Sequence, residues 1–409
     1  MLYHIQITMS RENIFPIYKP QGPTSFALMA QIKKITGEQK VGHAGTLDPL
    51  AEGILMVGVG RAATKKLSEA VKKEKEYLAD IKLGWTSATD DEEGQKVKSL
   101  KVRKVHKVEV ENVLKKFIGI IEQVPPIYSA IKIQGQRAYK LARKGEVVAL
   151  KSRPVEIKSI KIIKYNYPDL RLKVITGPGV YIRALARDIG RDLGVDGYLT
   201  GLKRTRVGQF KTTGSISIDK LAKKYLNSQI KILKSGGVGV IPTDTIYGLV
   251  GLAKNQKTVE RIYKIRKRNP AKSFIILISS WADLGKFGVR INSPTKKIIN
   301  KYWPGQVSII LPADKKLKYL HRGTNTLAFR WPDNEGLLTL LKKTGPLVAP
   351  SANLEGQNPA LTIKQAKRYF SNTVDFYIDR GKLEAAPSTL IKIEEGKIIV
   401  LRNGSVKVN

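Results

Sequence analysis

Residues 41–65 read VGHAGTLDPLAEGILMVGVGRAATK, a Gly-rich polar loop that leads into an apolar strand over 53–60. Asp48 stands in this loop between Leu47 and Pro49. Pro49 fixes its own φ and biases Asp48 towards an extended backbone, which presents the carboxylate in one direction. Such a carboxylate is suited to act as a nucleophile or a general base. A lone Asp before Pro is also a common turn residue, so other motifs have to distinguish the two roles.

Length and composition indicate a globular chain of more than one domain. The chain has 409 residues, of which 42% are hydrophobic and 26% charged. It contains no run of about 18 apolar residues and no secretory-signal pattern at its start, so we expect a cytoplasmic protein without membrane association. The absence of cysteine excludes disulfides, thiolate metal sites and cysteine nucleophiles, and only four histidines argue against a metal site.

The charge balance is strongly basic. Lys and Arg number 73 against 34 Asp and Glu, which gives a formal net charge of +39 spread over both halves of the chain. A cationic surface of this size attracts polyanions over long range, and it favours RNA or DNA as a partner. A general lysine bias in the source organism would produce the same balance, so charge alone does not identify the partner.

Periodicity predicts two α/β (α+β) domains, at 10–222 and 223–409. In the first domain we expect a half-buried strand pair over 153–165 and an amphipathic helix over 182–193. A helix over 217–234 should end at a Gly-rich stop, after which a new α/β pattern begins with GVGVIPTDTIYGLVGLA. The boundary therefore has no long flexible linker.

Several blocks accompany the Asp48 loop in a fixed order. They are YKPQGPTS (18–25), KEY (75–77), LGWT (83–86), TD (89–90), QVPPIYSAIK (123–132), GQRAY (135–139), YIRALARDIG (181–190) and LKRT (202–205). Together, over roughly residues 14–222, they resemble the TruB family of tRNA pseudouridine synthases. The resemblance implies a pseudouridine-synthase fold with a mixed, largely antiparallel sheet. It also implies isomerisation of the T-loop uridine of tRNA, position 55, without a cofactor.

The resemblance assigns roles to individual residues. Asp48 matches the catalytic aspartate, which acts either by attack on the nucleoside or by drawing a proton; Tyr77 matches the tyrosine that stacks on the uracil, and Arg183 the arginine that keeps the aspartate ionised. For uridine binding, His43 matches a histidine in the space of the flipped base, Lys19 a motif lysine beside the pocket, and Leu202 a pocket-lining leucine. A uridine in a folded loop has to be extruded before its bond is cut, and stacking on an aromatic ring stabilises it by about 1–3 kcal/mol. The RNA-binding module that follows this core in the family is expected to be missing.

A second series of blocks occupies the other half. They are IPTDTIYGL (241–249), YKIRKR (263–268), WPG (303–305), FRWP (329–332), APSAN (349–353), STL (388–390) and LRNG (401–404). They combine fixed cations with hydroxyl and amide donors, a mixture suited to phosphate and carboxylate groups. Over about residues 225–405 they resemble the YrdC/Sua5 family of L-threonylcarbamoyladenylate synthases, which implies a twisted mixed sheet with helices.

This second resemblance implies a reaction without tRNA. L-threonine, bicarbonate and ATP (with Mg²⁺) would give threonylcarbamoyl-AMP and pyrophosphate, and threonylcarbamoyl transferase machinery would use the product on tRNA adenosine 37. The family's Lys-x-Arg and Ser-x-Asn tetrad falls on Arg266, Arg268, Ser351 and Asn353. Thr243 and Thr245 would lie by the threonine and carbamate, and Arg330, Ser388 and Arg402 near the phosphates.

Three positions depart from the second family's pattern. Arg266 replaces the tetrad lysine, Ser308 replaces a threonine, and Glu355 places an anion near a site meant for phosphates. The sequence therefore predicts a bifunctional tRNA-modification enzyme, with one alternative. In the alternative the second half is a catalytically weak, cationic module that binds tRNA in place of the missing domain. The departures and the charge favour it, and the retained tetrad members disfavour it.

Overall fold

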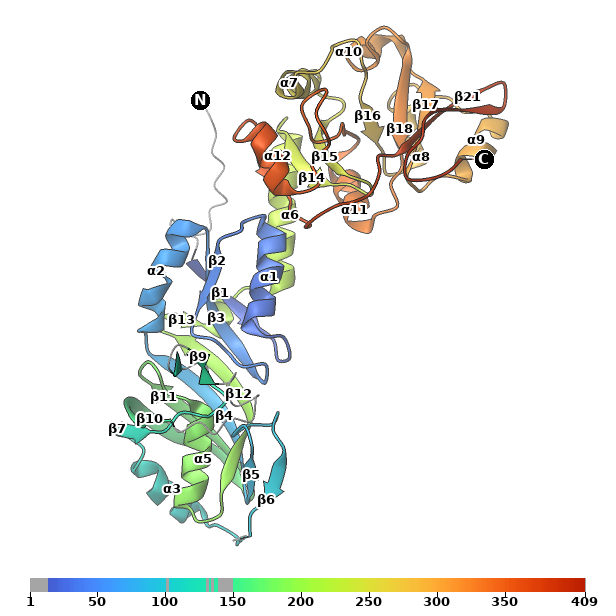
Figure 1. Ribbon diagram of the computed structural model, residues 1–409. Coiled ribbons are helices and arrows are strands. Elements are labelled where there is room, and N and C mark those ends of the chain that lie inside the picture. Colours follow the sequence, from blue (N-terminus) through green and yellow to red (C-terminus); the bar gives the residue numbers. More distant parts are fainter. Residues whose placement is uncertain (1–13, 101–102, 130–131, 134–135, 139–149, 409) are drawn as a thin grey trace. The chain divides into compact units, whose positions relative to one another are not determined.

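The computed structural model describes residues 14–100, 103–129, 132–133, 136–138 and 150–408 (Figure 1). The described chain forms two compact units, one from residues 14–32 and 38–218 and the other from 33–37 and 219–408. Each unit is an α/β body built on its own mixed sheet, as the sequence predicts. Among the described residues, no helix combines the length and the hydrophobicity that crossing a membrane requires.

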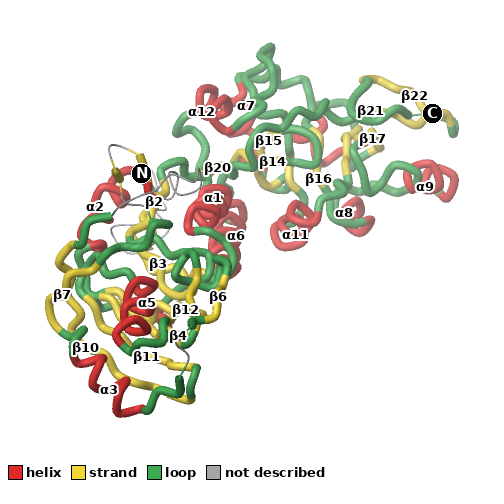
Figure 2. Tube along the Cα trace, turned by 60° about the horizontal axis from the view of Figure 1, so that its bottom comes forward, coloured by secondary structure: helices red, strands yellow, loops and turns green. Residues whose placement is uncertain are grey.

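The first unit is built on a nine-stranded sheet, whose strands are yellow in Figure 2. In spatial order they are β1 (Ile14–Lys19), β3 (Ala51–Val59), β12 (Gly197–Val207), β4 (Lys75–Leu83), β11 (Asp169–Thr176), β10 (Arg153–Asn166) and β7 (Gly119–Gln123), with β2 (Val41–Ala44) on β3 and β13 (Phe210–Lys211) on β12. Along this path only β3 and β12 run parallel, and every other pair is antiparallel. The prediction of a mixed, largely antiparallel sheet is confirmed.

Helices and two short hairpins complete the first unit. They are α1 (Ser25–Thr36), whose residues 33–36 belong to the other unit, α2 (Arg61–Val71), α3 (Lys107–Lys115), α5 (Ile182–Asp192), the hairpin β5 (Trp85–Ser87) with β6 (Lys96–Lys98), and the hairpin β8 (Lys132–Ile133) with β9 (Gln136–Arg137). The apolar face predicted for α5 is buried in the core of this unit through Ile182, Leu185 and Ile189. This packing fixes the direction of the arginines on the same helix.

The strand pair predicted over 153–165 is wrong. These residues form one long strand, β10, and its antiparallel partner β11 begins only at Asp169. The alternation of apolar and charged residues in β10 reflects one buried face and one exposed face of a single strand. The chain reverses at residues 167–168, which lie beyond the segment where the pattern placed the turn.

The second unit has a nine-stranded mixed sheet with helices around it. In spatial order its strands are β20 (Phe376–Tyr377), β14 (Gly239–Pro242), β15 (Tyr247–Leu252), β19 (Leu347–Val348), β16 (Ile275–Leu277), β18 (Thr326–Arg330), β17 (Val307–Pro312), β21 (Thr389–Glu394) and β22 (Lys397–Arg402). The helices are α6 (Ile218–Lys234), α7 (Gln256–Arg266), α8 (Trp281–Gly285), α9 (Ser293–Asn300), α10 (Lys318–His321), α11 (Glu335–Thr344) and α12 (Ile363–Phe370). The mixed sheet expected for this half is present.

The predicted boundary between residues 222 and 223 lies inside helix α6. The chain divides into its two units at Ile218 and Asp219, where α6 begins. The helix is anchored to the second unit, because Ile230 and Leu233 pack in a buried cluster with Ile241 and Leu277 of its sheet. The change of motif in the sequence therefore follows the structural division by a few residues.

Candidate active sites

Asp48 lies in the loop between β2 and β3, and two buried side chains hold this loop. The Lys19 ammonium donates to the carbonyl oxygens of Pro20 (3.0 Å), Pro49 (3.3 Å) and Ala51 (2.6 Å). The Ser25 hydroxyl donates to the carbonyl of Leu47 (2.8 Å) and accepts from its N–H (3.0 Å). Backbone on both sides of Asp48 is thus tied to fixed groups, which pre-organises the carboxylate.

Gly53 supports the same loop where β1, β3 and β12 meet. It has φ +110°, and a Cβ at this position would lie 2.2 Å from the carbonyl oxygen of Arg204. The buried Arg204 side chain donates to the carbonyls of Ile54 (2.8 Å) and Gly45 (2.7 Å). Only glycine combines this φ with so close a backbone approach. The glycine and the arginine therefore hold the loop against strand β12.

Arg183 joins two carboxylates. Its Nε lies 3.0 Å from Asp48 Oδ2, and its Nη1 lies 3.3 Å from Oδ2 of the buried Asp91. The same guanidinium donates to the carbonyls of Thr89 (3.1 Å) and Tyr128 (2.9 Å). The structure thus places Arg183 beside Asp48, as the sequence predicts.

Two opposing influences act on the Asp48 carboxyl. Its side chain is 42% exposed, yet loss of hydration is the larger influence and raises its pKa above the usual range. The positive charge of Arg183 lowers the pKa, and the negative charge of Asp91 raises it. Arg183 therefore offsets part of a penalty that the protein environment imposes on the charged form.

Lys19, the last residue of β1, is fully buried. Burial lowers the pKa of its ammonium to about 8, and the negative charge of Asp48 acts in the opposite direction. Its contacts are with carbonyl oxygens of the loop, so it holds the position of Asp48. The sequence places it beside a uridine pocket, and the structure adds this supporting contact.

Tyr77 and Leu202 lie close to the start of β3. Tyr77 on β4 is 6% exposed and belongs to the same buried cluster as Leu50, two residues beyond Asp48. Leu202 on β12 packs against this cluster, and its backbone pairs with Ala51. Both residues therefore lie in the framework around the Asp48 loop.

His43 lies on β2, opposite Val57 of β3. Among the described residues its Nδ1 has no hydrogen-bond partner, although the atom is buried. Burial, and then the charge of Arg204, lowers the pKa of the imidazole, so the ring is neutral at pH 7. An unpaired ring nitrogen here can receive a polar group of a ligand.

Sequence reasoning missed three residues of this site: Ser25, Asp91 and Arg204. Ser25 and Arg204 belong to sequence blocks that carry the resemblance, but neither hydroxyl nor guanidinium reveals which carbonyl it will bind. Asp91 follows directly after the Thr89-Asp90 block. Its neighbour Asp90 pairs with Arg187 (2.9 Å), so only the structure tells which of the two carboxylates faces Arg183.

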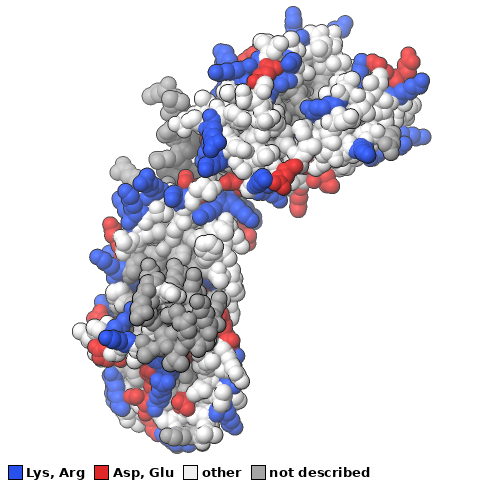
Figure 3. All heavy atoms as spheres, viewed as in Figure 1, with Lys and Arg blue, Asp and Glu red and all other residues white. Residues whose placement is uncertain are grey.

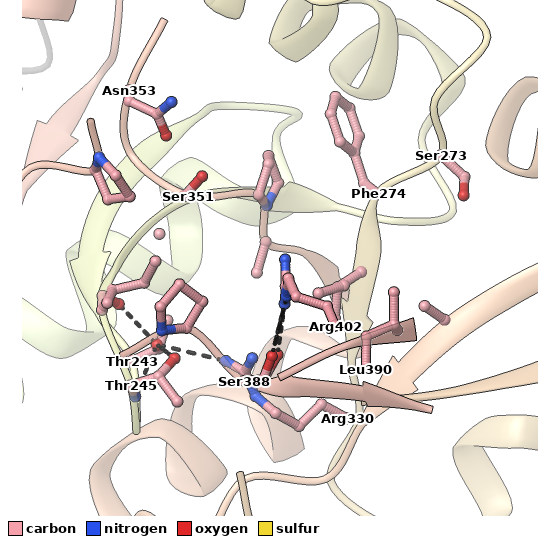
Figure 4. Close-up of a pocket in the computed structure, with 18 of the residues that line it drawn as sticks. Thr243, Thr245, Ser273, Phe274, Arg330, Ser351, Asn353, Ser388, Leu390 and Arg402 are labelled. Atoms are coloured by element: carbon pink, nitrogen blue, oxygen red, sulfur yellow. Dashed lines mark hydrogen bonds between the residues drawn. The ribbon is translucent and has the colours of Figure 1, made fainter. Parts of the chain in front are cut away.

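The second unit contains a cavity of about 350 Å³. All nine residues predicted to bind ATP and threonine line it: Thr243, Thr245, Arg266, Arg268, Arg330, Ser351, Asn353, Ser388 and Arg402. They come from the ends of β14, α7, β18, β19 and β22 and the segment before β21. Figure 4 shows the two threonines near Arg330, Arg402 beside Ser388, and Ser351 with Asn353 at the other end.

Arg266 binds both tetrad partners on the segment after β19. Its Nε donates to the carbonyl of Asn353 (2.9 Å), and its Nη2 donates to Asn353 Oδ1 (3.1 Å) and Ser351 Oγ (3.3 Å). Burial, and then the charge of Arg268, lowers the pKa of Arg266 to about 10. The planar guanidinium makes these contacts from two nitrogens in a fixed fork, a geometry that the single nitrogen of an ammonium group does not have.

Arg330 and Arg402 form the other cationic end of the cavity. Arg330 is 4% exposed, and its Nη2 lies 3.0 Å from Oδ1 of the equally buried Asp244. Arg402 donates to the carbonyl and the hydroxyl of Ser388, whose Oγ lies 2.8 Å from Ser308 Oγ. Burial lowers the pKa of Arg402, and the charges of Arg330 and Arg268 lower it further. The cations therefore repel one another across the cavity.

Two buried donors at this cavity lack partners. Within the described chain, Arg266 Nη1 and Arg330 Nε have no hydrogen-bond acceptor. No Asp or Glu is among the described residues that line the cavity. A buried donor without a partner is costly, and so is a cluster of like charges. Both costs are relieved by an anionic ligand with several oxygen acceptors.

Glu355 and Ser308, two of the positions that depart from the family pattern, both have polar partners in the structure. Ser308 contacts the Ser388 hydroxyl. Glu355 accepts from the N–H of Asn269 and lies 3.0 Å from Lys272 Nζ. These two contacts hold the pKa of its carboxyl below the usual range. Glu355 does not line the described cavity, so its charge is directed to the loop after α7.

The first half of the chain matches two family models and several curated proteins. A family model described as "TruB family pseudouridylate synthase (N terminal domain)" matches residues 33–182, and "tRNA pseudouridylate synthase B C-terminal domain" matches 183–235. tRNA pseudouridine synthase B of Thermobifida fusca is 40% identical over 222 residues, which is 52% of this chain and 75% of that protein. The Parabacteroides distasonis protein of the same name is 47% identical over 202 residues, 49% of this chain and 84% of that protein.

The match to a TruB C-terminal model bears on the module expected to be missing. That model ends at residue 235, so it covers α5, β12 and helix α6. Residues 183–235 therefore correspond to part of the TruB C-terminal domain. This match ends just before β14, the first strand of the second unit.

A different family matches the second half. The model that groups Sua5, YciO and YrdC, described as "Telomere recombination", matches residues 231–404. The crystal structure of P. abyssi Sua5 complexed with L-threonine is 27% identical, covering 44% of this chain and 54% of that chain with a TM-score of 0.42. This chain therefore spans about half the length of that Sua5 protein. The chain belongs to the TruB family of pseudouridine synthases and continues into a Sua5/YrdC domain.

Proposed function

We propose that the chain is a bifunctional tRNA-modification enzyme. Its first unit isomerises the T-loop uridine at position 55 of tRNA to pseudouridine. Its second unit makes threonylcarbamoyl-AMP from L-threonine, bicarbonate and ATP for the modification of adenosine 37. The first activity rests on the contact between Arg183 and Asp48. The second rests on four arginines around a cavity whose described lining residues include no carboxylate.

The first reaction rearranges bonds within one nucleotide. The N1–C1′ bond of the uridine breaks, the uracil turns, a C5–C1′ bond forms, C5 loses a proton and N1 gains one. Asp48 is the carboxylate available to free the base from C1′, by attack or by drawing a proton. Arg183 favours its charged form, and the contacts of Lys19 and Ser25 hold its loop. Tyr77 would stack on the detached uracil and accept the C5 proton.

The second reaction requires an anionic substrate held by fixed donors. The triphosphate of ATP satisfies the unpaired donors on Arg266 and Arg330 and separates the repelling guanidinium groups. Threonine and the carbamate would lie by Thr243 and Thr245, whose hydroxyl oxygens are 3.1 Å apart. Because no carboxylate lines the described cavity, Mg²⁺ would arrive with ATP and be held by its phosphates.

One experiment tests both activities in the same preparation. The purified chain is incubated with unmodified tRNA, and separately with ATP, threonine, bicarbonate and Mg²⁺, while pseudouridine and pyrophosphate are followed. Asp48→Asn should abolish pseudouridine and leave threonine-dependent pyrophosphate intact. Arg268→Ala should suppress threonine-dependent pyrophosphate and leave pseudouridine formation intact. A bound phosphate then loses a charged partner that contributes roughly 1.5–3 kcal/mol.

The alternative, a catalytically weak second unit that binds tRNA, gives a different result. It predicts no threonine-dependent pyrophosphate and weaker tRNA binding in Arg268→Ala. Pyrophosphate that appears without threonine would also contradict the proposed synthase.

A further inference from the structure

Helix α6, yellow-green in Figure 1, carries a line of lysines that the two proposed activities do not use. Lys223, Lys224, Lys231 and Lys234 are all exposed. At 100° per residue these positions lie within an arc of about 100°, so they share one face of the helix. We call them the α6 lysine stripe. At 1.5 Å per residue it is about 16 Å long, and Lys220 continues it towards the start of the helix.

The charges of the stripe are not neutralised within the described chain. None of the four lysines forms an ion pair with a described carboxylate. The one acidic residue of the helix, Asp219, lies in its first turn, away from Lys231 and Lys234. Lys and Arg are spread over this unit (Figure 3), and some of them have partners, such as Arg261 with Asp375 (2.7 Å) and Arg322 with Glu260 (2.8 Å). A line of four uncompensated cations on a rigid support attracts a polyanion.

The opposite face of α6 decides which polyanion fits. A basic amphipathic helix that binds a membrane inserts its apolar face among the lipids. In α6 that face is already occupied, because Leu221, Ile230 and Leu233 are buried. Ile230 and Leu233 pack with residues of the sheet and of α11. In the described chain the lysine face of the helix is exposed, which fits a hydrated polyanion such as a nucleic-acid backbone.

We propose that the α6 lysine stripe docks the phosphate backbone of the RNA substrate. The identity of the RNA as a tRNA rests on the proposed function of the first unit. Nucleic-acid duplexes carry about one charge per 1.7 Å of axis, so the stripe spans several phosphates. Lysine acts as a point charge without preference for a base, so the contact positions RNA without reading its sequence. The docking does not depend on catalysis in the cavity.

The test compares two fourfold variants. One replaces the stripe (Lys223→Gln, Lys224→Gln, Lys231→Gln and Lys234→Gln). The control removes four exposed lysines from elsewhere in the same unit (Lys297→Gln, Lys301→Gln, Lys342→Gln and Lys343→Gln), so the change in net charge is equal. Gln retains helix propensity, and circular dichroism checks the fold. The dissociation constant for an unmodified tRNA transcript is measured between 50 and 200 mM KCl, with pseudouridine formation at saturating tRNA.

The stripe variant should lose about 3 from the slope of log affinity against log salt, since each phosphate contact contributes roughly 0.7–0.9. In the control variant this slope should fall by less than about 1. In both variants the turnover rate at saturating tRNA should stay within twofold of the parent's. An unchanged slope, or an equal loss in the control, overturns the proposal. The proposal is also overturned if the stripe variant loses binding to phosphatidylserine vesicles while its RNA binding equals that of the parent. If the slope falls but the parent makes no pseudouridine, the docking stands and the proposed function of the first unit fails.

Discussion

Arg183 Nε lies 3.0 Å from Asp48 Oδ2, although 134 residues separate the two in the chain. One comes from a loop between two strands and the other from the first turn of α5. The guanidinium is nearly buried and also contacts Asp91, so its position is fixed before any substrate binds. A pre-organised charge of this kind costs no reorganisation during the reaction.

Asp48→Asn should lower pseudouridine formation by about 10⁴-fold, the order of loss seen when a catalytic carboxylate becomes an amide. The amide retains the shape of the side chain and removes its charge, so tRNA binding should change less than threefold. Quantifying pseudouridine in unmodified tRNA, together with a binding measurement, checks this. A variant with turnover within tenfold of the parent would show that Asp48 is not the reacting group.

The same substitution should raise stability at neutral pH. Burial raises the pKa of Asp48 in the folded protein, so ionisation of this carboxyl opposes folding above that pKa. Arg183 keeps a second carboxylate partner, Asp91, when Asp48 is replaced, so the substitution does not leave the buried guanidinium without a counter-charge. The advantage of Asp48→Asn should therefore be present at pH 7 and disappear as the pH falls below the usual Asp range, where both states are protonated. Melting temperatures of parent and variant at about pH 3, 5 and 7 test this. A variant less stable than its parent at pH 7 would mean that the ion pair with Arg183 outweighs burial.

Lys19 should give pseudouridine formation a decline above pH 8. Its pKa is lowered to about 8, and the neutral amine keeps two N–H donors for the three carbonyls that the ammonium binds. The loop around Asp48 is then held less firmly, and the rate should fall several-fold between pH 7 and pH 9. Lys19→Met should be slower at every pH and lack this decline. If Lys19→Met still showed the decline in rate above pH 8, a group other than Lys19 would be responsible for the decline.

Asp244→Asn should destabilise the second unit by about 3–5 kcal/mol, because it leaves the buried charge of Arg330 without its partner. The double variant Asp244→Asn with Arg330→Met should recover much of this loss, since it removes both charges. Three of the four tryptophans, Trp281, Trp303 and Trp331, lie in this unit, so urea unfolding followed by tryptophan fluorescence reports on it. Equal stability of the single variant and the parent would show that water solvates Arg330.

Arg266→Lys should reduce threonine-dependent pyrophosphate release between about tenfold and a hundredfold. A lysine cannot replace the fork that binds Ser351 and both oxygens of Asn353, and each charged hydrogen bond contributes roughly 1.5–3 kcal/mol. Ser351→Ala removes one of these contacts and should cost less. A rate preserved or raised in Arg266→Lys would show that charge alone is needed at this position.

Much of the fold follows from local pattern. The helices at α5 and α6 follow from apolar residues spaced three and four apart, and the two series of blocks identify both units in order. The same local reading misplaced a turn inside β10 and put the boundary at residue 222, within α6. Periodicity records which face of a segment is buried, and it does not record where a continuous strand or helix joins a different core.

The sequence by itself determined which residue types are available: one presented aspartate, the arginines, the hydroxyl pairs and a large excess of positive charge. Only the tertiary structure decided that Arg183 bridges Asp48 and Asp91, that Lys19 binds three carbonyls, and that Glu355 turns to Lys272. The physical reason is that these contacts, apart from that of Lys19 with its neighbour Pro20, join residues far apart in the chain. Strand register and helix packing set their distances, and no local spacing encodes either.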